Sequence, residues 1–476
     1  MRTRFILWEL RHQRADRAFW LLGLLLIVLA GFALANGARQ LRTQRAAIAE
    51  AVAFTESRTQ AGARLAADLN AGKAEVAPGR DPRTAQGFAH YHLISHPTKP
   101  ALALSTLTVG QSDLYPSVLQ LALSSRDFSL RAPSYEKPQR RRLLRGDAVV
   151  VVIYLIPLLL IALSYNLLSG ERERGTLPLV LLQRFSPARL VLGRSAVVGG
   201  LILGLLAALL VFGLLAARAL EISELGRLAL WLGVAFAYGA FWLALALLVT
   251  SRGGSSATNA IVLAGAWLLF TVVAPAAVNV AAKTICPVPS RMDHVLAERA
   301  ATDEISARRS ELLAVYLEDH PELVPDAAKK NAPDPLVVTQ MVYATTEQRL
   351  APVRARFAER LTQQQALVDR LKYLSPALLV QSALNDLSGT GLARHEAFRA
   401  QVSAHHDELR AYFQPRIVAK EKFDNYGEVP RFAFAEEPIR NVLARAAWPL
   451  AALLLIVAAV VATGVRSLRR YVPTAT

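Results

Sequence analysis

Six long stretches of apolar residues interrupt this chain, and none of them contains Asp, Glu, Lys, Arg or His. They cover residues 19–37, 148–168, 196–217, 228–250, 258–281 and 446–465. A helix of roughly 20 apolar residues crosses the ~30 Å hydrocarbon core of a bilayer and satisfies its own backbone hydrogen bonds there. The sequence therefore predicts an all-α polytopic membrane protein with six transmembrane helices.

Part of the chain must also lie outside the membrane in water, because its 476 residues carry a formal charge of +17 although 53% of them are hydrophobic. The spans predict five parts: 1–37, an amphipathic elbow and the first span; 38–147, a first external region; 148–281, spans two to five with a loop at 169–195; 282–445, a second external region that is mainly helical; and 446–476, the last span and a tail. Apolar spacing predicts helices at 41–69, 338–372 and 391–420, whereas alternation at 102–109 predicts short strands.

Arginines next to the spans predict the orientation, because short cationic segments are retained in the cytoplasm. They cluster at residues 2–17, 172–194 and 466–470. Both termini are therefore expected on the cytoplasmic side, in a bacterial inner membrane. Arg140, Arg141, Arg142 and Arg145 fall on the opposite side, but long loops translocate largely regardless of charge. The first span also resembles a cleavable secretion signal, and its removal would leave the other orientations unchanged.

The sequence lacks the motifs for nucleotide binding, for ion-coupled transport and for zinc-dependent hydrolysis. A phosphate-binding loop of the form G-x-x-x-x-G-K-[ST] does not occur in the sequence. Spans without ionisable side chains also argue against an ion-coupled carrier. The zinc-protease pattern that begins at His395 fails because Arg399 stands where the second histidine belongs. We expect no catalytic residue, no nucleic-acid partner and no metal site.

One weak alternative for a metal concerns three histidines in the first external region. His90, His92 and His96 have a spacing that could bring imidazoles together on a metal ion. No cysteine or carboxylate cluster lies near them in the sequence, so surface histidines are the favoured interpretation.

The loop between the second and third spans contains SGERERGTLPLVLLQRFSPARL, residues 169–190. Its charges precede an apolar run that predicts a short helix at 177–183, and Ser186 followed by Pro187 predicts a helix N-terminus. A short apolar helix beside charged residues suits insertion into a groove of another protein. The same helix could instead lie in the membrane surface with its charges solvated.

A resemblance favours the first interpretation. Glu171, Gly175 and Thr176 form E-x-x-x-G-T, and the segment from Ser186 to Arg194 follows it, which resembles the signature of ABC-2-type transporter permeases. This resemblance implies that the loop is a coupling helix that docks on a separate ATPase. The implied coupling residues are Glu171, Glu173, Gly175, Thr176, Leu177, Leu179, Leu182, Ser186 and Arg194. Pro178 departs from the family pattern and could shift the helix by a few residues.

A second block, residues 374–398, resembles the DUF3526-type permeases, which are related to NosY-like permeases. The resemblance implies the permease subunit of an ATP-binding-cassette transporter, with a second permease copy or homologue and two ATPase chains. ATP and Mg would be bound by those ATPases, with no cofactor on this chain. Such a complex would move substrate or transmit force to the outside. The alternatives are a non-transporting sensor or scaffold, and a membrane hydrolase that uses the external histidines.

Overall fold

The computed structural model describes residues 2–110, 115–123, 147–182, 186–219, 221–319, 321 and 335–470. Six of its helices are long and apolar enough to cross a membrane: Arg17–Asn70, Ala148–Glu173, Pro187–Ala216, Ile222–Thr250, Ser256–Ile285 and Ile439–Arg469. The described residues contain no strand, and only three isolated β-bridges occur among them. The predicted all-α polytopic membrane protein is confirmed.

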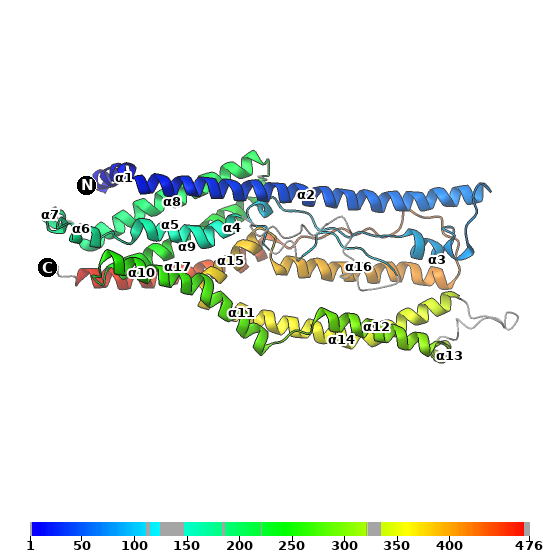
Figure 1. Cartoon of the computed structure of the whole chain (residues 1–476). Coiled ribbons are helices and arrows are strands. Elements are labelled where there is room, and N and C mark those ends of the chain that lie inside the picture. Colours follow the sequence, from blue (N-terminus) through cyan, green and yellow to red (C-terminus); the bar gives the residue numbers. More distant parts are fainter. Residues whose placement is uncertain are drawn as a thin grey trace.

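The spans form one bundle from which a second half of the molecule extends (Figure 1). Helix α1 (Arg2–Ala15), helices α6 (Ser169–Glu173) and α7 (Leu177–Leu182), and the end of α17 (Ile439–Arg469) lie together at one end of the bundle. We call this the terminal end. Everything beyond the opposite end of the spans is the distal region.

Helix α2 (Arg17–Asn70) joins the two halves without a break. Asp16 caps its N-terminus by accepting a hydrogen bond from the Ala18 amide at 2.9 Å. Its 54 residues extend over roughly 80 Å at 1.5 Å per residue, far more than one bilayer. The first span and the helix predicted at 41–69 are thus one continuous element.

The strands predicted at 102–109 are wrong. Residues Ala103–Thr106 form the 3-10 helix η3, because the backbone groups of this segment bond to helix ends and side chains instead of a neighbouring strand. The Leu104 amide donates to the Glu224 carboxylate at 3.1 Å, and the Gly110 amide donates to Asp147 at 3.2 Å. Thr106 is fully buried, so the alternation of apolar and hydroxyl residues did not mark a solvent-facing side.

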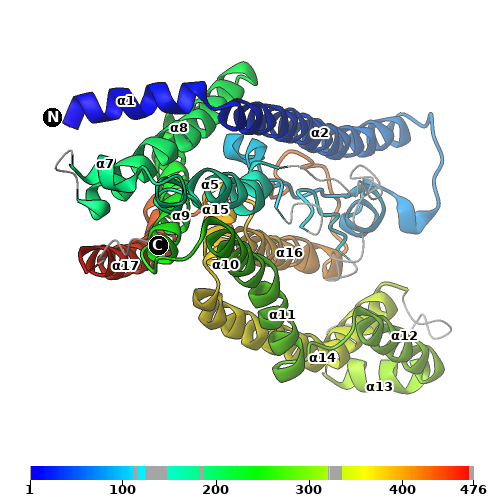
Figure 2. The ribbon, with the colours of Figure 1, turned by 60° about the vertical axis from the view of Figure 1, so that its left-hand side comes forward.

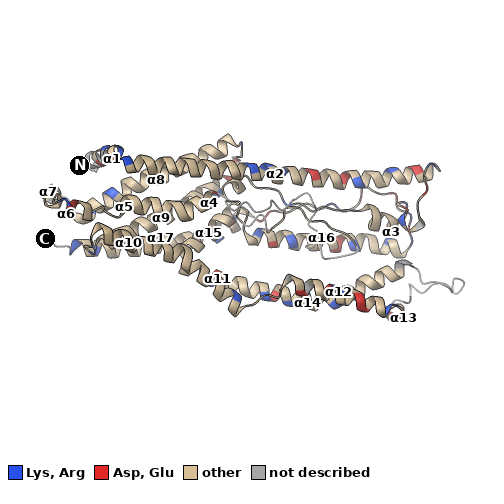
Figure 3. Ribbon diagram, viewed as in Figure 1, with Lys and Arg blue, Asp and Glu red and all other residues tan. Residues whose placement is uncertain are grey.

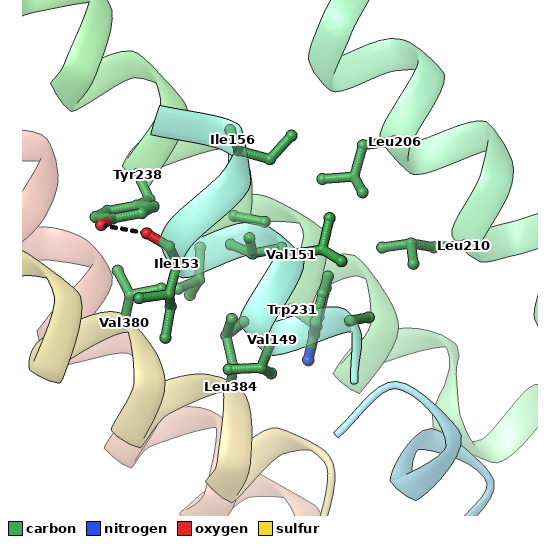
Figure 4. Close-up of a cluster of buried hydrophobic side chains, with 14 of the residues drawn as sticks. Val149, Val151, Ile153, Ile156, Leu206, Leu210, Trp231, Tyr238, Val380 and Leu384 are labelled. Atoms are coloured by element: carbon green, nitrogen blue, oxygen red, sulfur yellow. Dashed lines mark hydrogen bonds between the residues drawn. The ribbon is translucent and has the colours of Figure 1, made fainter. Parts of the chain in front are cut away.

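Helix α9 (Leu225–Thr250) forms the centre of the bundle. Its Trp231, Tyr238 and Trp242 are fully buried. They pack among α5 (Ile156–Ser164), α8 (Pro187–Ala216), α15 (Pro376–Leu387) and α17, and Figure 4 shows Val380 of α15 near Tyr238. The apolar helix α15, from the second predicted external region, therefore packs into the distal end of the bundle.

Two π-helical turns mark the places where α15 meets the spans. Val151–Leu155 (η5) precedes Pro157, and Leu269–Val273 (η7) lies between α10 (Ser256–Leu268) and α11 (Ala274–Ile285), just before Pro275. Proline has no amide hydrogen, so a preceding carbonyl loses its helical donor. The Tyr238 hydroxyl donates to the Ile153 carbonyl at 3.2 Å, and the Ser375 hydroxyl donates to the Phe270 carbonyl at 2.7 Å.

Replacing Ser375 by alanine should lower the free energy of unfolding by about 1 to 2 kcal/mol, because the Phe270 carbonyl would lose its donor. Ser375 also caps α15 by accepting from the Leu378 amide at 3.3 Å. Threonine at this position retains the hydroxyl and should restore most of the stability. Unfolding by sodium dodecyl sulfate in mixed micelles measures both variants, and equal stabilities of the alanine variant and the wild type would contradict the role of this bond.

The distal region contains two helical layers beside the outer half of α2 (Figures 1 and 2). Helix α16 (Leu392–Val418) lies between α2 and a layer of α12 (Arg291–Ala307), α13 (Arg309–Asp319) and α14 (Pro335–Leu371). Helices α14 and α16 confirm the predictions at 338–372 and 391–420. An aromatic cluster of Phe88, Phe398, Phe413 and Phe423 joins the two distal segments of the chain into one core.

Candidate functional site

The loop predicted to act in coupling folds at the terminal end as two short helices, α6 and α7. Between them Gly175 has a φ of +73°, a left-handed conformation that favours glycine. The Thr176 amide donates to the Glu171 carbonyl at 2.9 Å, and the Thr176 hydroxyl also donates to the Glu171 carboxylate. The spacing of Glu171, Gly175 and Thr176 thus has a local physical cause: these residues close one tight turn.

Arg194, in the second turn of α8, lies at the centre of this site. It donates through Nη2 to Glu171 Oε1 at 2.8 Å and through Nη1 to the Leu167 carbonyl at 2.9 Å. Its Nε lies 3.5 Å from Glu9 Oε2, an ion-pair distance too long for a strong hydrogen bond. Arg194 and Glu9 are 6% and 1% exposed, so a buried cation holds α1, α6 and α8 together.

A second set of bonds ties α6 to the turn between α9 and α10. Arg172 donates to the Gly253 and Gly254 carbonyls at 2.6 and 2.8 Å. The Glu173 carboxylate accepts from the Ser256 amide at 2.7 Å and from its hydroxyl at 2.8 Å, at the first turn of α10. A carboxylate at a helix N-terminus is favourable because the first amides have no partner within the helix. The alternating charges therefore bond to this protein itself.

The apolar residues of α7 are divided between two environments. Leu177 is buried among residues of α8, α9 and α17. Leu179 and Leu182 are 64% and 78% exposed. Helix α7 is thus anchored at its first residue and presents leucines to its surroundings further along. Ser186 begins α8 as predicted, since its hydroxyl accepts from the Arg189 amide at 3.3 Å.

The partners of these predicted residues come from distant parts of the chain and could not be predicted from the sequence. Glu9 and Gln13 lie on α1, where Gln13 donates to Glu9 at 3.1 Å, and Gly253, Gly254 and Ser256 lie 80 or more positions along the chain from α6. The two glycines at 253 and 254 are typical of a turn between two spans. Nothing in the sequence around them indicates that this turn contacts Glu173.

Charged residues lie at the terminal end and throughout the distal region, and they leave the middle of the bundle apolar (Figure 3). The structure does not bring His90, His92 and His96 together. His96 Nδ1 lies 3.1 Å from the Thr55 hydroxyl, and His92 Nε2 lies 3.0 Å from the Arg80 carbonyl. Within the described ranges, no group of three or more His, Cys, Asp or Glu has an arrangement that could hold a metal ion.

His395, another residue considered for hydrolysis, is buried in the distal region. Its Nδ1 lies 3.3 Å from Lys99 Nζ, and its ring stacks on Tyr115. Burial, together with the charges of Lys99 and Arg399, lowers the pKa of His395 to about 3. The imidazole is therefore neutral at ordinary pH and packs as part of the aromatic core.

Comparison with known families assigns one part of the chain. Residues 291–435 match the family described as "Domain of unknown function (DUF3526)", which confirms the predicted resemblance of residues 374–398 to this family. The match covers α12 to α16 and does not include the loop with α6 and α7. Neither the curated proteins nor the solved structures contain a match to this chain.

Proposed function

We propose that this protein is the permease subunit of an ATP-binding-cassette transporter, and that a separate ATPase docks on α7. The observation that carries the proposal is an exposed pair of leucines, Leu179 and Leu182, on a short helix that follows the Glu171 turn held by the buried Arg194. A force applied to α7 would reach α1, α8 and α10 through the bonds of Arg194 and Glu173. Bracing of this kind suits a helix that transmits motion.

The arrangement also favours an orientation. The described arginines at 2–17, 172–174, 189–194 and 466–470 lie at the terminal end, so we place this end in the cytoplasm of a bacterium, with the distal region outside the inner membrane. Two ATPase chains would bind ATP and Mg, and a second permease copy or homologue would complete the complex. Hydrolysis would drive substrate movement, or force transmission to the distal region.

Within this proposal the predicted coupling residues have two roles. Leu179 and Leu182 would contact the ATPase, because they are exposed. Glu171, Glu173, Gly175, Thr176, Leu177, Ser186 and Arg194 would position α7, because their side chains or backbones make contacts within this chain or shape its turns.

The double variant Leu179→Glu/Leu182→Glu should reduce capture of the ATPase at least tenfold, because two carboxylates would have to enter an apolar groove. The measurement is co-purification of the full chain with ABC-type ATPase chains of the same genome, starting with those of neighbouring genes. Ile222→Glu is the matched control, since Ile222 is 89% exposed and begins the span Ile222–Thr250 at the end away from the turn between α9 and α10. Loss of capture by the control, or unchanged capture by the double variant, would contradict docking on α7.

A further inference from the structure

A cavity of about 410 Å³ opens in the distal region between α12, α14 and α16. Its volume lies within the ~300–1,000 Å³ that is common for ligand sites. The apolar part of its lining consists of buried or half-buried side chains, among them Ile305, Val338, Leu350 and Ile417. The hydroxyl of Thr346 and the amide of Gln340 also line it. A ligand there would have to be apolar along its length and also offer hydrogen-bonding groups.

Two arginines line this cavity, Arg410 and the exposed Arg309, and Arg410 is the one held in place by an aromatic ring. Its guanidinium stacks on the Tyr343 ring, 3.5 Å from the centroid, and donates to Gln414 Oε1 at 3.2 Å. No carboxylate of the described residues lies within ion-pair distance of it. His90, which also lines the cavity, adds no charge, because burial and the charge of Arg410 lower its pKa. An anionic group of a ligand would find Arg410 available.

The two acidic residues of the lining differ. Glu347 is neutralised by Arg354 at 2.9 Å, whereas Glu298 has no cation within ion-pair distance among the described residues. Glu298 also lies away from Arg410. Two contacts, Glu304 with Arg349 and Cys286 with Gln364, show that α14 runs antiparallel to the segment from α11 to α12.

This antiparallel register fixes where the charges lie. It places Tyr343, and with it Arg410, near the level of Arg309, and it places Glu298 near the level of residues 352–355 of α14. At 1.5 Å per residue, the anionic and cationic ends of the cavity are roughly 16 Å apart along the helices. We propose that this cavity binds a short linear apolar peptide with free termini, whose ammonium group pairs with Glu298 and whose carboxylate pairs with Arg410.

Length and chemistry support this class of ligand. An extended chain of four residues spans at most about 14 Å, and an ion-pair distance at each terminus covers the remainder of the separation. The peptide groups would bond to hydroxyl and amide side chains that an acyl chain would leave without a partner. The proposal does not depend on α7 or on the ATPase, because every residue that carries it lies in the distal region.

Isothermal titration of tetra-alanine into the full chain in lipid nanodiscs tests the proposal. Wild type should bind the free peptide, and both N-acetylation and C-terminal amidation should weaken binding at least tenfold. Glu298→Gln should be insensitive to acetylation and Arg410→Met insensitive to amidation, because each variant lacks the partner of the modified terminus. Arg416→Met is the matched control, since Arg416 stacks on Tyr412 of the same helix and does not line the cavity.

Three outcomes would overturn the proposal: no binding of tetra-alanine to wild type, equal affinity for free and blocked peptides, or equal sensitivity of both variants to both blocking groups. Binding of octanoate in place of the peptide, abolished by Arg410→Met but not by Glu298→Gln, would identify an anionic amphiphile as the ligand and would also overturn it. Circular dichroism of each variant separates lost binding from lost folding.

Discussion

Replacing Arg194 by methionine is expected to lower the free energy of unfolding by about 3 to 5 kcal/mol, because it removes the cation and leaves two carboxylates in a buried site. Glu171 and Glu9 both approach the guanidinium, and the Leu167 carbonyl would lose its donor as well. Methionine fills most of the volume of the arginine stem, so the loss reports mainly on charge and hydrogen bonding. Unfolding by sodium dodecyl sulfate in mixed micelles measures it.

Two further variants separate the charge effect from a general loss of packing. The triple variant Glu9→Gln/Glu171→Gln/Arg194→Met carries no buried charge at this site and should recover a large part of the stability, since the three residues are energetically coupled. Arg308→Met removes a similar pair, Arg308 with Glu311, from an exposed position and should leave the unfolding midpoint unchanged. A single Arg194 variant as stable as the wild type would show that the buried cation does not stabilise the site.

The spans were predictable from the sequence because the bilayer imposes one simple constraint, a long apolar stretch that forms a helix. The ends of the helices were less predictable. Helix α2 continues through Asn70 without a break, and α8 begins at Pro187, nine positions before the predicted span at 196. Hydropathy reports where the lipid contact ends, whereas caps such as Ser186 determine where the helix begins.

The candidate site was predictable only in part. The turn formed by Glu171, Gly175 and Thr176 depends on neighbours within five positions, so its residues could be recognised together. Glu9 and Ser256 reach the same site from 162 positions before Glu171 and 83 positions after Glu173. Such contacts depend on how the spans pack, and a single sequence carries no local signal for them. The cavity beside Arg410 was missed for the same reason, since it forms only where α12, α14 and α16 meet.

The packing of α15 shows a further limit. Its residues Pro376–Leu387 were predicted as part of an external region, yet Leu384 and Leu387 are fully buried in the bundle core. Twelve residues are too few for a span, so hydropathy with a window of about 20 cannot detect such a helix. Prolines at 157 and 275 were visible, but the carbonyls they leave unpaired could be matched to Tyr238 and Ser375 only in three dimensions.

The second large effect is expected where α2 passes from the spans into the distal region. A Cβ added at Gly37 would lie 1.8 Å from the Thr106 carbonyl oxygen and 2.8 Å from the carbonyl carbon of the same residue. Both are main-chain atoms of η3, which cannot rotate away as a flexible side chain could. Gly37→Ala should therefore force α2 away from η3 and lower the free energy of unfolding by about 1 to 3 kcal/mol or more.

Gly31 provides the matched control, because it lies on the same helix and a Cβ there would meet nothing within 4 Å. Gly31→Ala should leave stability unchanged or raise it by up to about 1 kcal/mol, since alanine is the better helix former. Detergent unfolding of the two variants side by side isolates the close approach from helix propensity. Equal effects at both positions would mean that α2 and η3 can separate without cost, and the continuous helix would then not hold the distal region against the spans at this point.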